Sequence, residues 1–177
     1  MTRNYFFENI QILEGSRSTL KEEAVLIKDG VIKAFGKKAH QNAELLGIKR
    51  EKTKNLLLAP CLVDPHSFLE SPFKGKEENI YSLIQKATFA GYGQLAILPR
   101  SNRWRDHIES IISLKTIKSE VLIHLWGGFS LGGQSSTLSR HTDLLQNGAI
   151  GLADDDFMPP IELLRQGLLL GEMKKYP

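Results

Sequence analysis

The sequence predicts an α/β protein in which strands and helices alternate, preceded by a small N-terminal β segment. Three observations predict this class: a tight-turn signal between two short apolar runs, a nearly continuous apolar run at residues 56–63, and four strand–helix pairs from there onward. Hydrophobic residues make up 41% of the 177 residues and charged residues 24%, as in ordinary globular proteins. We expect two domains, residues 1–55 and 56–177.

The first 55 residues are rich in strand patterns. Asp29-Gly30 lies between the β-prone runs 24–27 and 31–36, and this dipeptide readily adopts the positive φ angles of a two-residue hairpin turn. The sequence therefore predicts a hairpin here. The other elements expected in this segment are a strand at 5–13 and a short helix at 39–46.

Strands alternate with helices from residue 56 onward. The expected strands are 56–63, 94–98, 121–125 and 149–152, and the expected helices are 80–90, 104–114, 138–146 and 160–170. The run 56–63 is typical of a strand buried on both faces, and its Cys61 is expected to be a small buried hydrophobe. The alternation implies parallel pairing through right-handed crossovers. Because a closed barrel takes about 250 residues, these units form either a small open sheet or half of a barrel.

Candidate functional residues follow the predicted strands, since the carboxyl ends of parallel strands gather at one edge where sites form. Asp64 and His66 follow the first strand, Arg100 the second, and Asp154-Asp155 the fourth. Imidazole and carboxylate groups bind zinc, and a zinc-bound water is a nucleophile near neutral pH. One histidine and an acidic cluster alone nevertheless favour a hydrogen-bonded strand-end histidine and acids that stabilise the next helix.

Several other polar or glycine-rich features are expected to be structural. His124 lies inside a strand and is expected to be a satisfied core histidine. Residues 127–133 lack the spacing of a phosphate-binding loop and predict a flexible loop. The residues expected to be solvated are His40, His107 and His141, and those expected to pack are Trp104 and Trp126.

Sequence motifs along nearly the whole chain resemble those of dihydroorotases, which belong to the amidohydrolase superfamily. Residues 59–66, APCLVDPH, resemble the P-G-L-V-D-x-H entry strand, and LIKDGVIKAFG at 26–36 resembles I-K-D-G-x-I-x-x-I-G. The further matching blocks, in the family's order, are KEENI at 76–80, AGYG at 90–93, ILPRS at 97–101 and GAIGLADD at 148–155.

The resemblance implies a (β/α)8 barrel and a small β domain built from both chain ends. This chain would supply the N-terminal β segment and the first four βα units, and the remaining strands would lie beyond Pro177. The family is zinc-dependent and interconverts N-carbamoyl-aspartate and dihydroorotate in pyrimidine biosynthesis. By this resemblance His66, Asp154 and Asp155 keep plausible metal-ligand identity, and the turn geometry decides which of the two acids would face a metal.

Three departures from the family pattern affect the implied site. Phe68 stands at the second metal-histidine position and cannot coordinate a metal. Glu70 replaces the arginine that would bind the substrate carboxylate, so an anion would be repelled where a bidentate pair should form. Arg100 replaces an asparagine and is the remaining candidate for substrate binding, unless it pairs with Glu70. We therefore expect zinc to bind weakly or not at all.

We expect a dihydroorotase-like homologue without ring-closing activity, acting as a structural or regulatory partner of aspartate carbamoyltransferase or associating with itself. Two alternatives stay open: an active cyclic amidohydrolase with an altered substrate, and a truncated piece without independent function. The net charge of +3 is spread along the chain, which argues against nucleic-acid binding. No secretory signal is present and no apolar run reaches the roughly 18 residues of a membrane span, so we expect a cytoplasmic protein.

Overall fold

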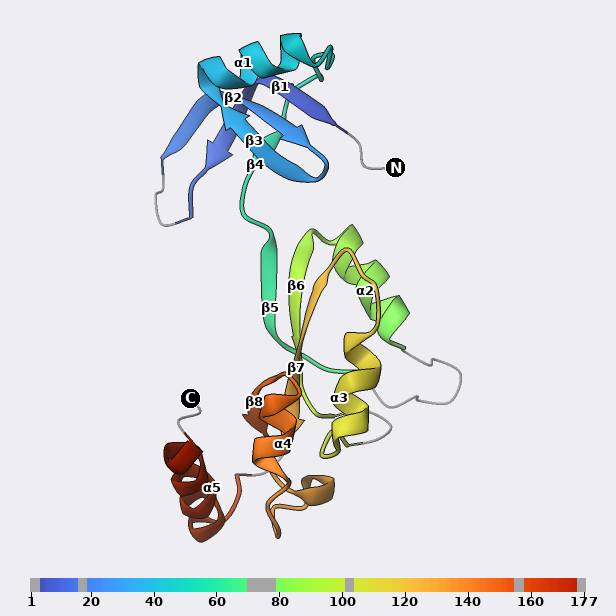
Figure 1. Cartoon of the computed structure of the whole chain (residues 1–177), viewed down its shortest axis with the longest axis vertical. Coiled ribbons are helices and arrows are strands. Elements are labelled where there is room, and N and C mark those ends of the chain that lie inside the picture. The colour runs from blue at the N-terminus through green and yellow to red at the C-terminus, as the bar shows by residue number, and fades with distance from the viewer. Residues whose placement is uncertain (1–3, 16–18, 70–78, 101–103, 155–157, 175–177) are drawn as a thin grey trace. The chain divides into compact units, whose positions relative to one another are not determined.

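The computed structural model of the chain describes residues 4–15, 19–69, 79–100, 104–154 and 158–174, with side chains up to 171. The chain forms two compact units, Met1–Pro60 and Cys61–Pro177, which are coloured blue to teal and green to red in Figure 1. The division falls a few residues after the expected boundary between residues 55 and 56. Within the described residues, no helix has the length and apolar character to cross a bilayer.

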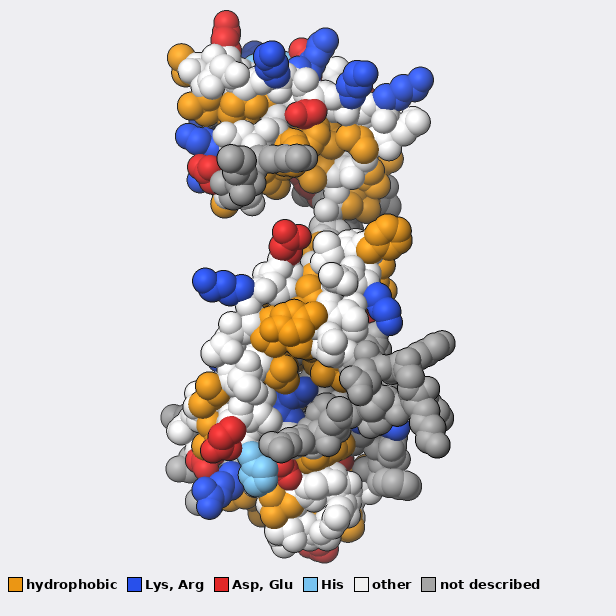
Figure 2. Space-filling model, turned by 90° about the vertical axis from the view of Figure 1, so that its right-hand side faces the viewer, with side chains coloured by type: hydrophobic (Ala, Val, Ile, Leu, Met, Phe, Trp, Pro, Cys, Tyr) orange, Lys and Arg blue, Asp and Glu red, His pale blue; other side chains and the backbone are white. Residues whose placement is uncertain are grey.

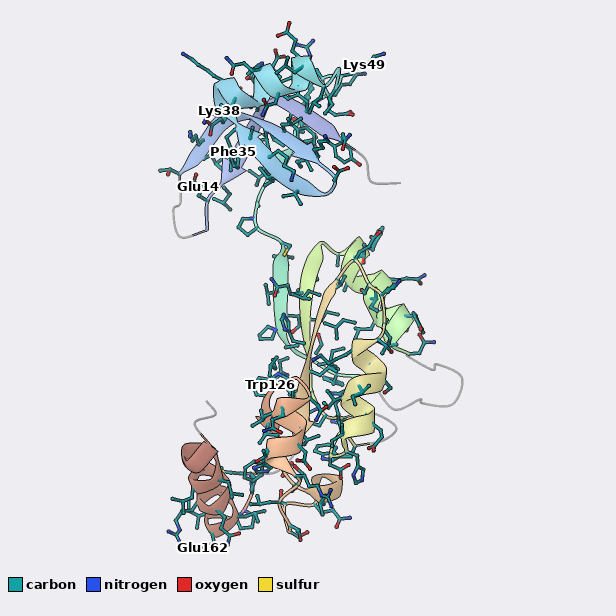
Figure 3. The ribbon with its side chains drawn as sticks, viewed as in Figure 1. Glu14, Phe35, Lys38, Lys49, Trp126 and Glu162 are labelled. Carbon is teal, nitrogen blue, oxygen red and sulfur yellow. The ribbon has the colours of Figure 1, made fainter. Side chains whose placement is uncertain are left out.

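The first unit is a mixed sheet with one helix. Its strands are β1 (Tyr5–Leu13), β2 (Leu20–Lys28), β3 (Val31–Phe35) and β4 (Leu57–Leu58), and its helix is α1 (Gly36–Leu45). The strand order is β3-β2-β1-β4, with β4 parallel to β1 and the other pairs antiparallel. Basic and acidic side chains both lie on the surface of this unit (Figure 2 and Figure 3).

The predicted hairpin of the first unit is confirmed. Asp29 and Gly30 have φ angles of 55° and 74°, as a tight turn between right-twisted strands requires. Helix α1 follows directly after β3 and covers one face of the sheet. Ala39 and Ala43 of this helix are buried there against Leu26 of β2.

The second unit contains a parallel sheet in sequence order. Its strands are β5 (Leu62–Ser67), β6 (Tyr92–Ile97), β7 (Leu122–Gly128) and β8 (Ala149–Ala153), and each neighbouring pair is parallel. The predicted parallel alternation of strands and helices is confirmed. All four strands run in one direction, so their carboxyl ends gather at one edge.

The helices of the second unit are α2 (Ile80–Phe89), α3 (Ile108–Lys115), α4 (His141–Gln146) and α5 (Ile161–Lys174), and a short 3-10 turn η1 (Leu131–Gly133) follows β7. The first three of them cover one face of the sheet. Helices α2, α3 and α4 contribute to one apolar cluster with the strands. Its fully buried members include Ile97, Ile111, Leu125 and Leu144.

The apolar run 56–63 is not the doubly buried strand that the sequence predicts. β4 pairs with β1 of the first unit, and β5 begins only at Leu62. Leu62, Val63 and Cys61 are exposed. The physical reason is that β5 is an edge strand that pairs only with β6, and the described helices that pack on this sheet lie on one side of it. An apolar run in the sequence shows that its side chains favour burial, but it does not show that the fold buries them.

Replacement of Ile111 by alanine should destabilise the second unit, because this side chain is fully buried between α3 and the sheet. We expect the free energy of unfolding to fall by about 2–5 kcal/mol for Ile111→Ala. The matched control is Ile112→Ala on the same helix, at a half-exposed position, with a loss below about 1 kcal/mol. Urea denaturation of the full chain measures both, and equal losses would contradict the assigned helix face.

Candidate functional site

Asp64 holds the end of β5 through its own neighbours. Its Oδ1 accepts the backbone N–H of His66 at 2.9 Å, and its Oδ2 accepts the hydroxyl of Ser67 at 2.6 Å. The His66 side chain is exposed. In this arrangement the Asp64 side chain stabilises the backbone at the end of its own strand.

Arg100 and Phe68 meet at the ends of β6 and β5. The Arg100 guanidinium carbon lies 5.7 Å from the centre of the Phe68 ring, within the range of a cation–π interaction. The predicted pairing of Arg100 with Glu70 stays a prediction, because Glu70 lies outside the described residues. Phe68 therefore contacts the residue that was the remaining candidate for substrate binding.

Asp154 fastens the end of β8 to the loop that follows β7. Its Oδ1 accepts the backbone N–H of Ser130 at 2.9 Å, and its Oδ2 accepts the Ser130 hydroxyl at 2.6 Å and the Ser135 hydroxyl at 3.2 Å. Ser130 is fully buried, so these bonds satisfy polar groups that water does not reach. Asp155, the other predicted ligand, lies outside the described residues.

Residues 127–133 are not the flexible loop that the sequence predicts, because they comprise the end of β7, two connecting residues and the turn η1, and hydrogen bonds hold them in place. The Asp106 carboxylate accepts the backbone N–H of Gly132 at 2.8 Å, and the Trp104 indole donates to the Ser130 carbonyl at 3.0 Å. Gly133, with φ of 67°, lies against the Trp104 ring where a Cβ would collide. Trp104 is thus a packing residue, as predicted.

Arg105 is a buried residue at the strand ends that the sequence analysis missed. Its Nη1 donates to the carbonyls of Ile97, Leu98 and Trp126 at 2.8–3.0 Å, which joins the ends of β6 and β7. The side chain is 1% exposed, and burial lowers the pKa of its guanidinium to about 10. The sequence pattern did not indicate this role, because it predicted a helix over residues 104–114. In the structure α3 begins only at Ile108, so Arg105 precedes the helix.

His124 and His141 show how well the local sequence predicts whether a histidine side chain is buried. His124 is half-buried with its Nε2 3.0 Å from the Gln94 side-chain oxygen, as expected for a satisfied core histidine. His141 was expected to be solvated, and this is wrong. It is buried, with Nε2 2.7 Å from the Phe129 carbonyl, because α5 packs over it at Gly167.

The described strand-end residues do not fit a zinc site. In the described ranges no three His, Cys, Asp or Glu side chains cluster in a way that could hold a metal ion. A catalytic zinc usually takes three protein ligands, whereas the oxygens of Asp64 and Asp154 already accept hydrogen bonds from neighbouring groups. The chemistry that this arrangement supports is mutual hydrogen bonding that fixes the strand ends.

Comparison with known proteins finds distant relatives among dihydroorotases. A probable dihydroorotase-like protein from Synechocystis sp. is 27% identical over 148 residues, which are 70% of this chain and 34% of that protein. The dihydroorotase of Geobacter metallireducens is 24% identical over 172 residues, which are 93% of this chain and 39% of that protein. The chain therefore spans little more than a third of the length of these relatives.

The fold is similar to part of a solved cyclic amidohydrolase structure. L-hydantoinase (dihydropyrimidinase) from Arthrobacter aurescens superimposes with a TM-score of 0.60 at 17% identity, over 84% of this chain and 32% of that one. No family model matches the chain. The resemblance read from the motifs is confirmed: the chain has distant dihydroorotase homologues, and its α/β architecture resembles part of an amidohydrolase fold.

Replacement of Asp154 by alanine should destabilise the second unit, because the buried Ser130 would lose its acceptor. We expect Asp154→Ala to lower the free energy of unfolding by about 2–3 kcal/mol. The matched control is Asp143→Ala on α4, whose carboxylate lies 3.9 Å from the exposed Arg140, with a loss below about 1 kcal/mol. Thermal and urea denaturation measure both variants. If Asp154→Ala left the free energy of unfolding unchanged, this carboxylate would not contribute to the stability of the second unit.

Proposed function

We propose that this chain is a dihydroorotase-like protein that does not close the dihydroorotate ring and serves as a structural or regulatory homologue. Its parallel sheet corresponds to the first four units of an amidohydrolase (β/α)8 barrel. The observation that carries the proposal is the contact between Phe68 and Arg100. An aromatic ring stands where a metal-binding imidazole is needed, and the neighbouring cation lies against it.

The hydrogen bonds that the other strand-end carboxylates already accept support the same proposal. Asp154 binds Ser130 and Ser135, and Asp64 binds its own turn. A hydrolytic zinc site needs ligands whose lone pairs face the metal and an open position for water. Carboxylates with their oxygens already hydrogen-bonded would have to give up those bonds before they could serve as ligands.

The proposed role is association, with aspartate carbamoyltransferase as one partner and a second copy of the chain as another. Several dihydroorotases are among the proteins that the chain matches, and the proposal of aspartate carbamoyltransferase rests on that kinship. The residues described at the strand ends offer hydrogen bonds and packing that would keep the sheet rigid without catalysis. Stability and binding would then be the properties to measure, in addition to turnover.

The purified chain of 177 residues should neither cyclise N-carbamoyl-aspartate nor retain zinc in stoichiometric amount, because the second imidazole is replaced by Phe68. Cyclisation is followed by chromatography of the product, and the metal content by elemental analysis after dialysis against zinc. We expect turnover at background and well under one zinc per chain.

The histidine variants make this test specific. His66→Asn removes the strand-end imidazole, and His107→Asn, at an exposed position before α3, is the matched control. Stoichiometric zinc and turnover in the original chain, both lost in His66→Asn and kept in His107→Asn, would overturn the proposal in favour of an active cyclic amidohydrolase.

A further inference from the structure

We draw no further inference here: the strongest candidate, the cavity between the end of β5 and the start of α3 that the buried Arg105 lines, is bounded by Leu69 and Trp104, which adjoin in sequence residues outside the described ranges, and nothing in the structure shows what covers it.

Discussion

The second unit is organised by the one-sided cover of its parallel sheet. Helices α2, α3 and α4 bury one face of β5 to β8 around Ile97, Ile111 and Leu125, and this packing supplies most of the apolar burial in the unit. In the described part of the second unit, β5 and β8 each pair with one strand only. The exposure of Val63 follows from the edge position of β5 and not from the character of the residue.

The strand ends are fixed by polar groups that bind one another. Arg105 donates hydrogen bonds to three backbone carbonyls at the ends of β6 and β7. Asp154, at the end of β8, accepts hydrogen bonds from Ser130. A fully buried guanidinium is costly, and its lowered pKa reflects that cost, which the three hydrogen bonds to carbonyls partly offset. The edge where related folds build active sites is here occupied by structural hydrogen bonds.

The distant homology and the chemistry of the strand-end residues therefore support different conclusions about activity. The order of the motifs and the match to dihydroorotases relate the chain distantly to those proteins, and its fold resembles about a third of L-hydantoinase. At the positions that the resemblance assigns to the site, Phe68 is an aromatic residue and Arg100 lies against it. A fold has no activity unless the residues of its site are suited to the chemistry. The distant family relationship is therefore compatible with the proposed lack of activity.

The sequence by itself determined the order of the elements, their parallel pairing and the Asp29-Gly30 hairpin, because periodicity and turn chemistry act over a few residues. It also identified Phe68 as unable to bind a metal, since that follows from the side chain alone. Only the tertiary structure decided burial: it exposed the run at Leu62, buried His141 beneath α5 and brought Arg105 to the strand ends. Burial depends on which elements, distant in the chain, come to lie together, and no local pattern encodes that.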